Sequence, residues 1–195
     1  MKVDTSLIQQ LRELTGAGMM DAKRALEKTG GDLTQAVEVM RRAGQKIAAK
    51  KQDRATREGT IGVYAHSSGK LVSCVSVACE SDFVAKNAVF TDLAHELAMQ
   101  VAATEPTYVA PADVPADIIS HETSILREQL QREGKPAKIW EKIIRGKLQK
   151  FYAETCLLQQ PYIKDDSLTV EQLIHAAVLK LGENIQVKSF TKVTL

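Results

Sequence analysis

The clearest structural signal in the chain is TIGVYAHSSGKLVSCVSVACESDFVAKN, residues 60–87. Residues 60–66 and 70–79 are rich in strand-forming side chains and flank a Gly-containing turn, so they predict an antiparallel hairpin. The next apolar pattern, at about residues 89–103, has the spacing of a helix. A local strand pair followed by helices predicts an α+β fold in which helices pack on a small sheet.

Upstream of the hairpin, the sequence predicts three short helices. Glycines within residues 16–18 and 30–31 interrupt the helical pattern, because glycine readily adopts backbone angles that a helix cannot use. Ser6 is the expected N-cap of the first helix, and Asp32, paired with Gln35, is the expected N-cap of the third. The result is a compact bundle, too small to be very stable alone.

Large apolar residues almost vanish after Ile47, which predicts a basic linker, helical or extended. Downstream of the hairpin, helices are expected at residues 116–133 and 136–152, and a later one ending at Gly182. The tail alternates apolar and polar residues and predicts a third strand. The predicted parts are therefore a helical domain, 1–43, a linker, 44–58, and an α+β core with a three-stranded antiparallel sheet, 59–195.

Composition excludes several classes of protein. The chain has 195 residues and a formal net charge of only +2, which gives no global reason to expect a nucleic-acid binder. No apolar run approaches the ~18 residues of a membrane span, and no secretory leader is visible, so we expect a cytoplasmic protein. Three cysteines are too few for a disulfide framework or a structural zinc site, and no metal or cofactor is expected.

A catalytic site is the first alternative for the hairpin region, where His66, Cys79, Glu80 and Asp82 lie close in sequence. No nucleophile elbow accompanies Cys79, and the motifs for nucleotide binding and zinc hydrolysis are absent. The sequence therefore argues against an enzyme.

Two further features have both a structural and a functional interpretation. Met19 and Met20 follow the first glycine turn, where they either fill a gap between helices or project as an adaptable contact surface. Phe83 is either a core residue or an exposed aromatic anchor for a partner. From the residues alone, burial is the commoner outcome for all three.

The motifs TGAGMMD and CESDFVAKN, in this order, resemble those of bacterial elongation factor Ts. Residues 11–44 resemble the ubiquitin-associated-like domain of that family, residues 46–59 its linker, and GKPAKIWEKIIRGKLQKFY a later segment, so the resemblance covers essentially the whole chain. It implies a guanine nucleotide exchange factor that binds elongation factor Tu carrying GDP and promotes GDP release by disturbing the magnesium and phosphate site, so that GTP can load.

The resemblance also implies which residues meet the partner. Members of the family place a pair matching Asp82 and Phe83 beside the partner's magnesium and phosphate site, and the hairpin around Tyr64 against its third domain. The expected partner contacts are Arg12, Met19, Met20, His66, Asp82, Phe83 and Val84. No membrane and no direct nucleic-acid partner is implied.

Long members of the family carry two related core subdomains and a helical-hairpin insertion. This sequence shows one sheet and one DFVAKN in their place. Short members can compensate by forming a homodimer through the core, and we expect the sheet, with the terminal strand IQVKSFTKVTL at its edge, to be the contact.

Overall fold

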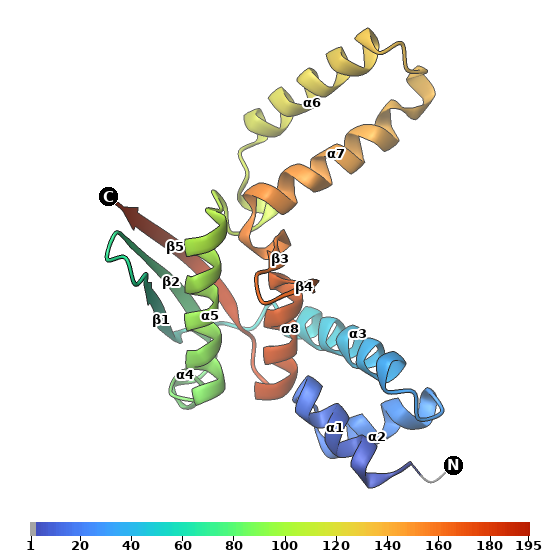
Figure 1. Cartoon of the computed structure of the whole chain (residues 1–195), viewed down its shortest axis with the longest axis vertical. Coiled ribbons are helices and arrows are strands. Elements are labelled where there is room, and N and C mark those ends of the chain that lie inside the picture. Colours follow the sequence, from blue (N-terminus) through green and yellow to red (C-terminus); the bar gives the residue numbers. More distant parts are fainter. Residues whose placement is uncertain (1–2) are drawn as a thin grey trace. The chain divides into compact units, whose positions relative to one another are not determined.

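The computed structural model describes residues 3–195 and confirms the α+β class (Figure 1). The chain divides into two compact units, one formed by residues 1–102 and 171–195 and the other by residues 103–170. These units cut the chain differently from the boundaries 1–43, 44–58 and 59–195, which stay a prediction. Each unit is described by itself below.

Three helices open the first unit: α1 (Thr5–Thr15), α2 (Met19–Lys28) and α3 (Leu33–Lys51). Asp32 caps α3 as predicted, since its Oδ1 accepts from the Gln35 backbone N–H at 2.9 Å. The prediction that Ser6 caps α1 is wrong. Asp4 is the N-cap, and its Oδ1 accepts from the Ser6 backbone N–H at 3.1 Å, so α1 begins two residues earlier than the capping pattern indicated.

Half of the buried core residues of this bundle are alanines, which allow close approach of the helices. Its fully buried members are Leu11, Ala22, Leu26 and Ala36. Helix α3 continues through the first half of the expected linker, to Lys51, because its later turns are also packed. Ala48 is buried there, and a Cβ at Gly44 would lie 3.2 Å from the carbonyl oxygen of His175 in α8 (Val170–Leu181).

The predicted three-stranded sheet is confirmed. Strands β1 (Glu58–Ala65), β2 (Leu71–Cys79) and β5 (Gln186–Thr194) are antiparallel in the order β1-β2-β5. Helix α5 (Ala88–Thr104) lies against one face. Gly62 permits this contact, because a Cβ there would clash with the carbonyl oxygen of Ala94 in α5.

The second unit contains two long helices, α6 (Ala116–Arg132) and α7 (Trp140–Thr155), which run out and back as a helical hairpin (Figure 1). Helix α7 begins at Trp140 and not at Pro136, which precedes a short 3-10 turn, Ala137–Ile139. The Trp140 indole N–H donates to the Lys135 carbonyl at 2.8 Å and closes the connection.

A second sheet, also in this unit, overturns the expectation of a single one. Strands β3 (Pro161–Tyr162) and β4 (Asp165–Thr169) pair antiparallel across a two-residue connection. The connection is the turn at residues 163–164, and β4 begins at Asp165. Strands this short carry too few residues for the two-residue alternation that predicts a strand. The remaining 3-10 turns are Pro111–Asp113 and Leu157–Gln159.

Candidate functional site

Phe83 lies at the start of α4 (Asp82–Ala85), a single helical turn that follows β2. Its side chain is 78% exposed, so the interpretation of Phe83 as a core residue is wrong. An aromatic side chain left in water retains its full apolar area for a later contact. Phe83 is therefore available as an anchor for a partner.

The turn beneath Phe83 is held at both ends. Ser81 is the N-cap of α4, and its Oγ accepts from the Val84 backbone N–H at 3.4 Å. Val84 is only 5% exposed and packs inward. Val84 thus supports the turn from below and does not belong to the exposed surface, contrary to its place among the expected contacts.

Asp82 forms an ion pair with Lys86 on the outer side of α4, with 2.9 Å between Oδ2 and Nζ. This hydrogen bond and the lysine charge lower the pKa of Asp82 below its ordinary value, and the same bond raises the pKa of Lys86. Both side chains are well exposed. At neutral pH, Phe83 is therefore flanked by a charged carboxylate whose field is partly neutralised.

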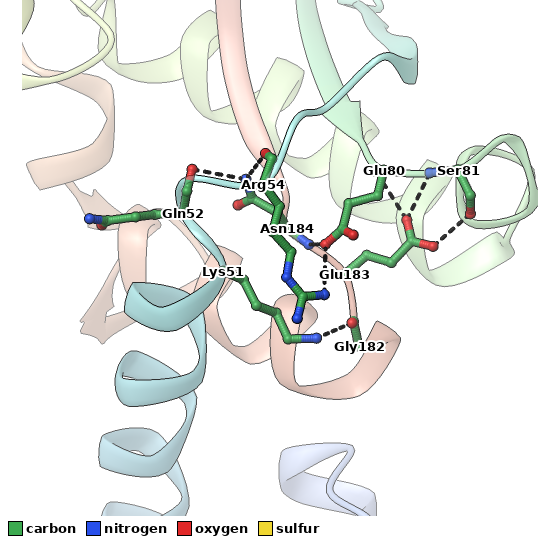
Figure 2. Close-up of polar contacts among 8 residues, drawn as sticks. All are labelled: Lys51, Gln52, Arg54, Glu80, Ser81, Gly182, Glu183 and Asn184. Carbon is green, nitrogen blue, oxygen red and sulfur yellow. Dashed lines mark hydrogen bonds and ion pairs between the residues drawn. The ribbon is translucent and has the colours of Figure 1, made fainter.

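A polar network fixes the chain just before α4 (Figure 2). The Glu183 carboxylate accepts from the backbone N–H groups of Glu80 and Ser81, each at 3.0 Å, and from the Ser81 hydroxyl at 2.6 Å. In return, the Glu80 carboxylate accepts from the Asn184 backbone N–H at 2.7 Å. Sequence reasoning missed Glu183 and Asn184, since they are more than 100 residues away from their partners and carry no local motif.

A second exposed apolar surface lies where α1 meets α2. Met19 and Met20 are each 58% exposed at the start of α2, and Leu14 at the end of α1 is exposed with them. The interpretation that both methionines fill a gap between helices is wrong. Exposed methionines suit an adaptable contact, because the side chain is flexible and polarisable. Leu14 was not singled out from the sequence, although its place before the glycine turn was visible.

Local contacts define this α1–α2 turn. Gly16 ends α1 with φ +67°, and its N–H donates to the Arg12 carbonyl. The Arg12 side chain is exposed, and its Nε donates to the Ala17 carbonyl at 3.3 Å. The Thr15 hydroxyl donates back to the Leu11 carbonyl at 2.6 Å. Arg12 thus holds the turn from which Met19 and Met20 project.

His66 lies at the β1–β2 turn and is exposed. Its Nδ1 is 3.0 Å from the Tyr64 hydroxyl, and the Tyr64 ring lies 6.0 Å from the ring of His95 in α5. The two histidines and the tyrosine form a small aromatic cluster at the far end of the hairpin from Phe83.

The arrangement separates Cys79 from His66, which argues against a nucleophilic pair of these two residues. Cys79 pairs with Glu58 at one end of the hairpin, whereas His66 lies beyond the other end, roughly 26 Å away at about 3.3 Å per residue. Burial raises the pKa of the Cys79 thiol, which donates to the Ser81 carbonyl at 3.2 Å. A neutral, buried thiol is a poor nucleophile.

One face of the three-stranded sheet carries exposed apolar side chains. Val63 pairs with Cys74, and Val72 pairs with both Ala65 and Val193, so these residues share a face opposite to that of Gly62 and α5. Ile61, Val63, Val72 and Val193 are all exposed on it. Within residues 3–195, no three His, Cys, Asp or Glu side chains are grouped to hold a metal ion, and no helix is long and apolar enough to cross a membrane.

Comparison with known proteins places this architecture in a family. Residues 5–195 match the family model described as "Elongation factor TS". The chain is 49% identical over 195 residues to elongation factor Ts of Coprothermobacter proteolyticus, covering 100% of this chain and 99% of that protein. It is 50% identical over 185 residues to that of Moorella thermoacetica, covering 95% and 91%. With matches of this extent, the chain belongs to the elongation factor Ts family.

Proposed function

We propose that this chain is a guanine nucleotide exchange factor that binds elongation factor Tu carrying GDP and accelerates the release of GDP. The observation that carries the proposal is the exposure of Phe83 beside the charged Asp82, on a turn held in place by a cap and a polar network. Membership of the elongation factor Ts family supports elongation factor Tu as the partner. The exposed position of Phe83 on α4 supports the way in which that partner is engaged.

Exchange of this kind needs binding energy and no bond-making chemistry in the factor. Bound GDP is held by its phosphates and Mg²⁺ against backbone N–H groups and a lysine of the partner. A side chain that is buried only when those contacts are disturbed favours the open state. If the factor weakens GDP binding by a given ratio, GDP weakens factor binding by the same ratio.

Magnitudes show why one anchor is not sufficient. Shifting a two-state equilibrium from mostly closed to mostly open requires a difference of about 5.5 kcal/mol. Burying one large apolar side chain contributes about 1.5–3 kcal/mol. Burial of Phe83 therefore supplies only part of the required free energy. The exposed methionines at the α1–α2 turn are the natural second contact. In this division, Met19, Met20 and Arg12 dock the factor, while Phe83 and Asp82 disturb the nucleotide site.

The decisive experiment is stopped-flow release of fluorescent mant-GDP from elongation factor Tu, with and without this protein. Acceleration that saturates with the concentration of the factor supports the proposal. A release rate that is the same with and without the factor rejects the proposal.

A site around His66 and Tyr64 that meets the partner's third domain is part of the same proposal. His66→Ala should then weaken the complex.

We also propose that the protein acts as a homodimer through the exposed face of its three-stranded sheet. Ile61, Val63, Val72 and Val193 form an apolar surface on that face, and the terminal strand β5 supplies its edge. A two-fold axis through such a face buries the same residues of both copies. Sedimentation equilibrium should show a dimer that Val63→Lys dissociates, and a monomer at working concentration would reject it.

Direct binding to RNA is the second candidate function, suggested by the basic residues around Lys50 and Lys51. The Lys51 ammonium donates to the Gly182 carbonyl, which gives this lysine a role inside the protein. An RNA-binding role predicts affinity that falls steeply with salt and with Lys50→Ala. We favour the cytoplasmic exchange factor because that basic segment offers no aromatic platform.

A further inference from the structure

The turn that presents Phe83 is too short to hold its own shape. Helix α4 has four residues, and a single helical turn is unstable alone because nucleation fixes many dihedral angles for few hydrogen bonds. Its own anchors are the Ser81 cap and the buried Val84. The Asp82–Lys86 pair is exposed and adds little. Something outside α4 must fix the direction of Phe83.

Glu183 supplies that constraint from the turn between α8 and β5 (Figure 2). One carboxylate oxygen accepts from two successive backbone N–H groups, of Glu80 and Ser81, and the other accepts from the Ser81 hydroxyl. All three donors belong to the two residues that precede α4. Hydrogen bonds to an ionised acceptor are roughly twice as strong as neutral ones, and three on one carboxylate define its position closely.

Neighbouring contacts hold Glu183 itself in place. Gly182 has φ +77°, and its N–H donates to the Val178 carbonyl, which ends α8 and turns the chain toward residues 80–81. The buried Asn184 side chain donates to the carbonyl groups of Gln52 at 3.1 Å and Arg54 at 2.9 Å. The 183–184 turn therefore joins the segment before α4 to the chain that leads out of α3.

Side chains of residues 79–81 make further contacts that hold this segment in place. The Glu80 carboxylate accepts from the Asn184 backbone N–H and lies 3.5 Å from the Arg54 guanidinium. The Cys79 thiol donates to the Ser81 carbonyl. Without Glu183, the backbone N–H groups of Glu80 and Ser81 would lose their acceptor. The Ser81 hydroxyl would also lose the carboxylate to which it donates. Phe83, two residues further on, would then sample other directions.

We propose that Glu183 is the positioning residue for Phe83, so that the exchange activity depends on a carboxylate that acts through the turn carrying Phe83. This inference rests on the exchange function proposed above and names a further residue that serves it. A fixed anchor loses less conformational freedom when it binds, which is the general advantage of preorganisation. Glu183 thus acts through the direction of Phe83 and not through added contact area.

The primary test is mant-GDP release from elongation factor Tu by the full-length protein with Glu183→Ala. We expect the maximal release rate to fall about tenfold, which corresponds to about 1.4 kcal/mol. Glu183→Gln should retain activity within about twofold, since an amide can accept from both backbone N–H groups and meet the Ser81 hydroxyl with its own N–H. Glu141→Ala, an exposed glutamate on α7, is the matched control and should leave the rate unchanged.

A double-mutant cycle separates positioning from a general structural effect. If Glu183 acts through Phe83, adding Glu183→Ala to Phe83→Ala lowers the rate no further. If the second change lowers the rate by the same tenfold factor in both backgrounds, Glu183 acts elsewhere and the inference is wrong. An unchanged rate for Glu183→Ala alone also overturns it.

Ser81 provides an independent route if Glu183→Ala does not fold. Ser81→Ala removes the 2.6 Å contact with Glu183 and should lower the rate, whereas Ser81→Thr keeps the hydroxyl and should not. Hydrogen exchange at the Glu80, Ser81 and Val84 amides needs no partner, and Glu183→Ala should accelerate it at these positions. Unchanged exchange at these amides would reject the positioning role of Glu183. A wild-type protein that does not accelerate mant-GDP release from elongation factor Tu would instead reject the exchange function itself.

Discussion

The two exposed apolar turns of this protein are built in opposite ways. The α1–α2 turn, which presents Met19 and Met20, is shaped by residues within a few positions of it, among them Gly16 and Arg12. The α4 turn, which presents Phe83, is shaped by Glu183, whose backbone partner Ser81 is 102 positions away. A contact surface can therefore be assembled either by the local sequence or by tertiary hydrogen bonds.

This difference suggests a division of labour. A turn that presents exposed methionines suits docking, which requires an accessible and adaptable surface. A turn held by tertiary contacts exists only in the completed fold, and its rigid direction suits the step that disturbs the nucleotide site. Four experiments test the difference between the two turns and the contacts around them.

The largest effect should come from Phe83→Ala. Truncating a buried anchor in an interface typically costs about 2 kcal/mol or more, so we expect the maximal rate of GDP release to fall roughly thirtyfold. The fold should survive, because the side chain is 78% exposed in the free protein. Stopped-flow release and circular dichroism measure the two outcomes. A loss of affinity with an unchanged maximal rate would assign Phe83 to docking and contradict the proposed difference between the two turns.

Gly16→Ala should perturb the α1–α2 turn. Gly16 has φ +67°, and a Cβ there would lie 2.7 Å from the Lys180 side chain. The left-handed backbone costs a non-glycine residue about 1–2 kcal/mol, and we expect the free energy of unfolding in urea to fall by that amount. Gly18→Ala is the control, since φ is −63° and the added Cβ has 3.6 Å to its nearest neighbour. Equal losses for both variants would show that the backbone angle is not the cause.

Met20→Ala should weaken docking to a smaller extent. The side chain is already 58% exposed, so its burial in a complex is worth about 1 kcal/mol, or roughly fivefold in affinity for nucleotide-free elongation factor Tu. The maximal release rate should stay the same. Titration calorimetry measures the affinity, with Lys23→Ala on the same helix as the control. An affinity equal to that of the wild type would remove Met20 from the interface.

The smallest effect should be a dependence on pH at the contact between α3 and α8. Burial lowers the pKa of His175 below its ordinary value of 6.5, with a smaller opposing effect of Glu171. Its Nδ1 is buried without a hydrogen-bond partner among the described residues. The unfolded chain then binds the proton more readily, so the free energy of unfolding falls as the pH drops below the unfolded pKa and levels off below the folded one.

Urea unfolding across this pH range tests the assignment to His175. His175→Leu should flatten the dependence, whereas His121→Leu on α6 should not change it. A dependence that persists in His175→Leu would place the titrating group elsewhere.

Much of the secondary structure was predictable because its signals are local. The hairpin, the three N-terminal helices and the third strand follow from alternation, helical spacing and glycine breaks, and Asp32 caps its helix as expected. The errors have different causes. Helix α3 continues to Lys51 because it packs on α8, a segment distant in the sequence, whereas the strands of the second sheet are too short to show a period.

The sequence alone was enough to predict most of the elements, their order and the family, since capping, turn formation and side-chain periodicity depend on neighbours along the chain. Which apolar side chains stay in water depends on the tertiary structure. Met19, Met20 and Phe83 were expected to be buried on residue type alone, and all three are exposed, while Val84 is buried. Exposure depends on what packs above a side chain, and the segment before the α4 turn is hydrogen-bonded to Glu183, which is far away in the sequence and adjacent in space.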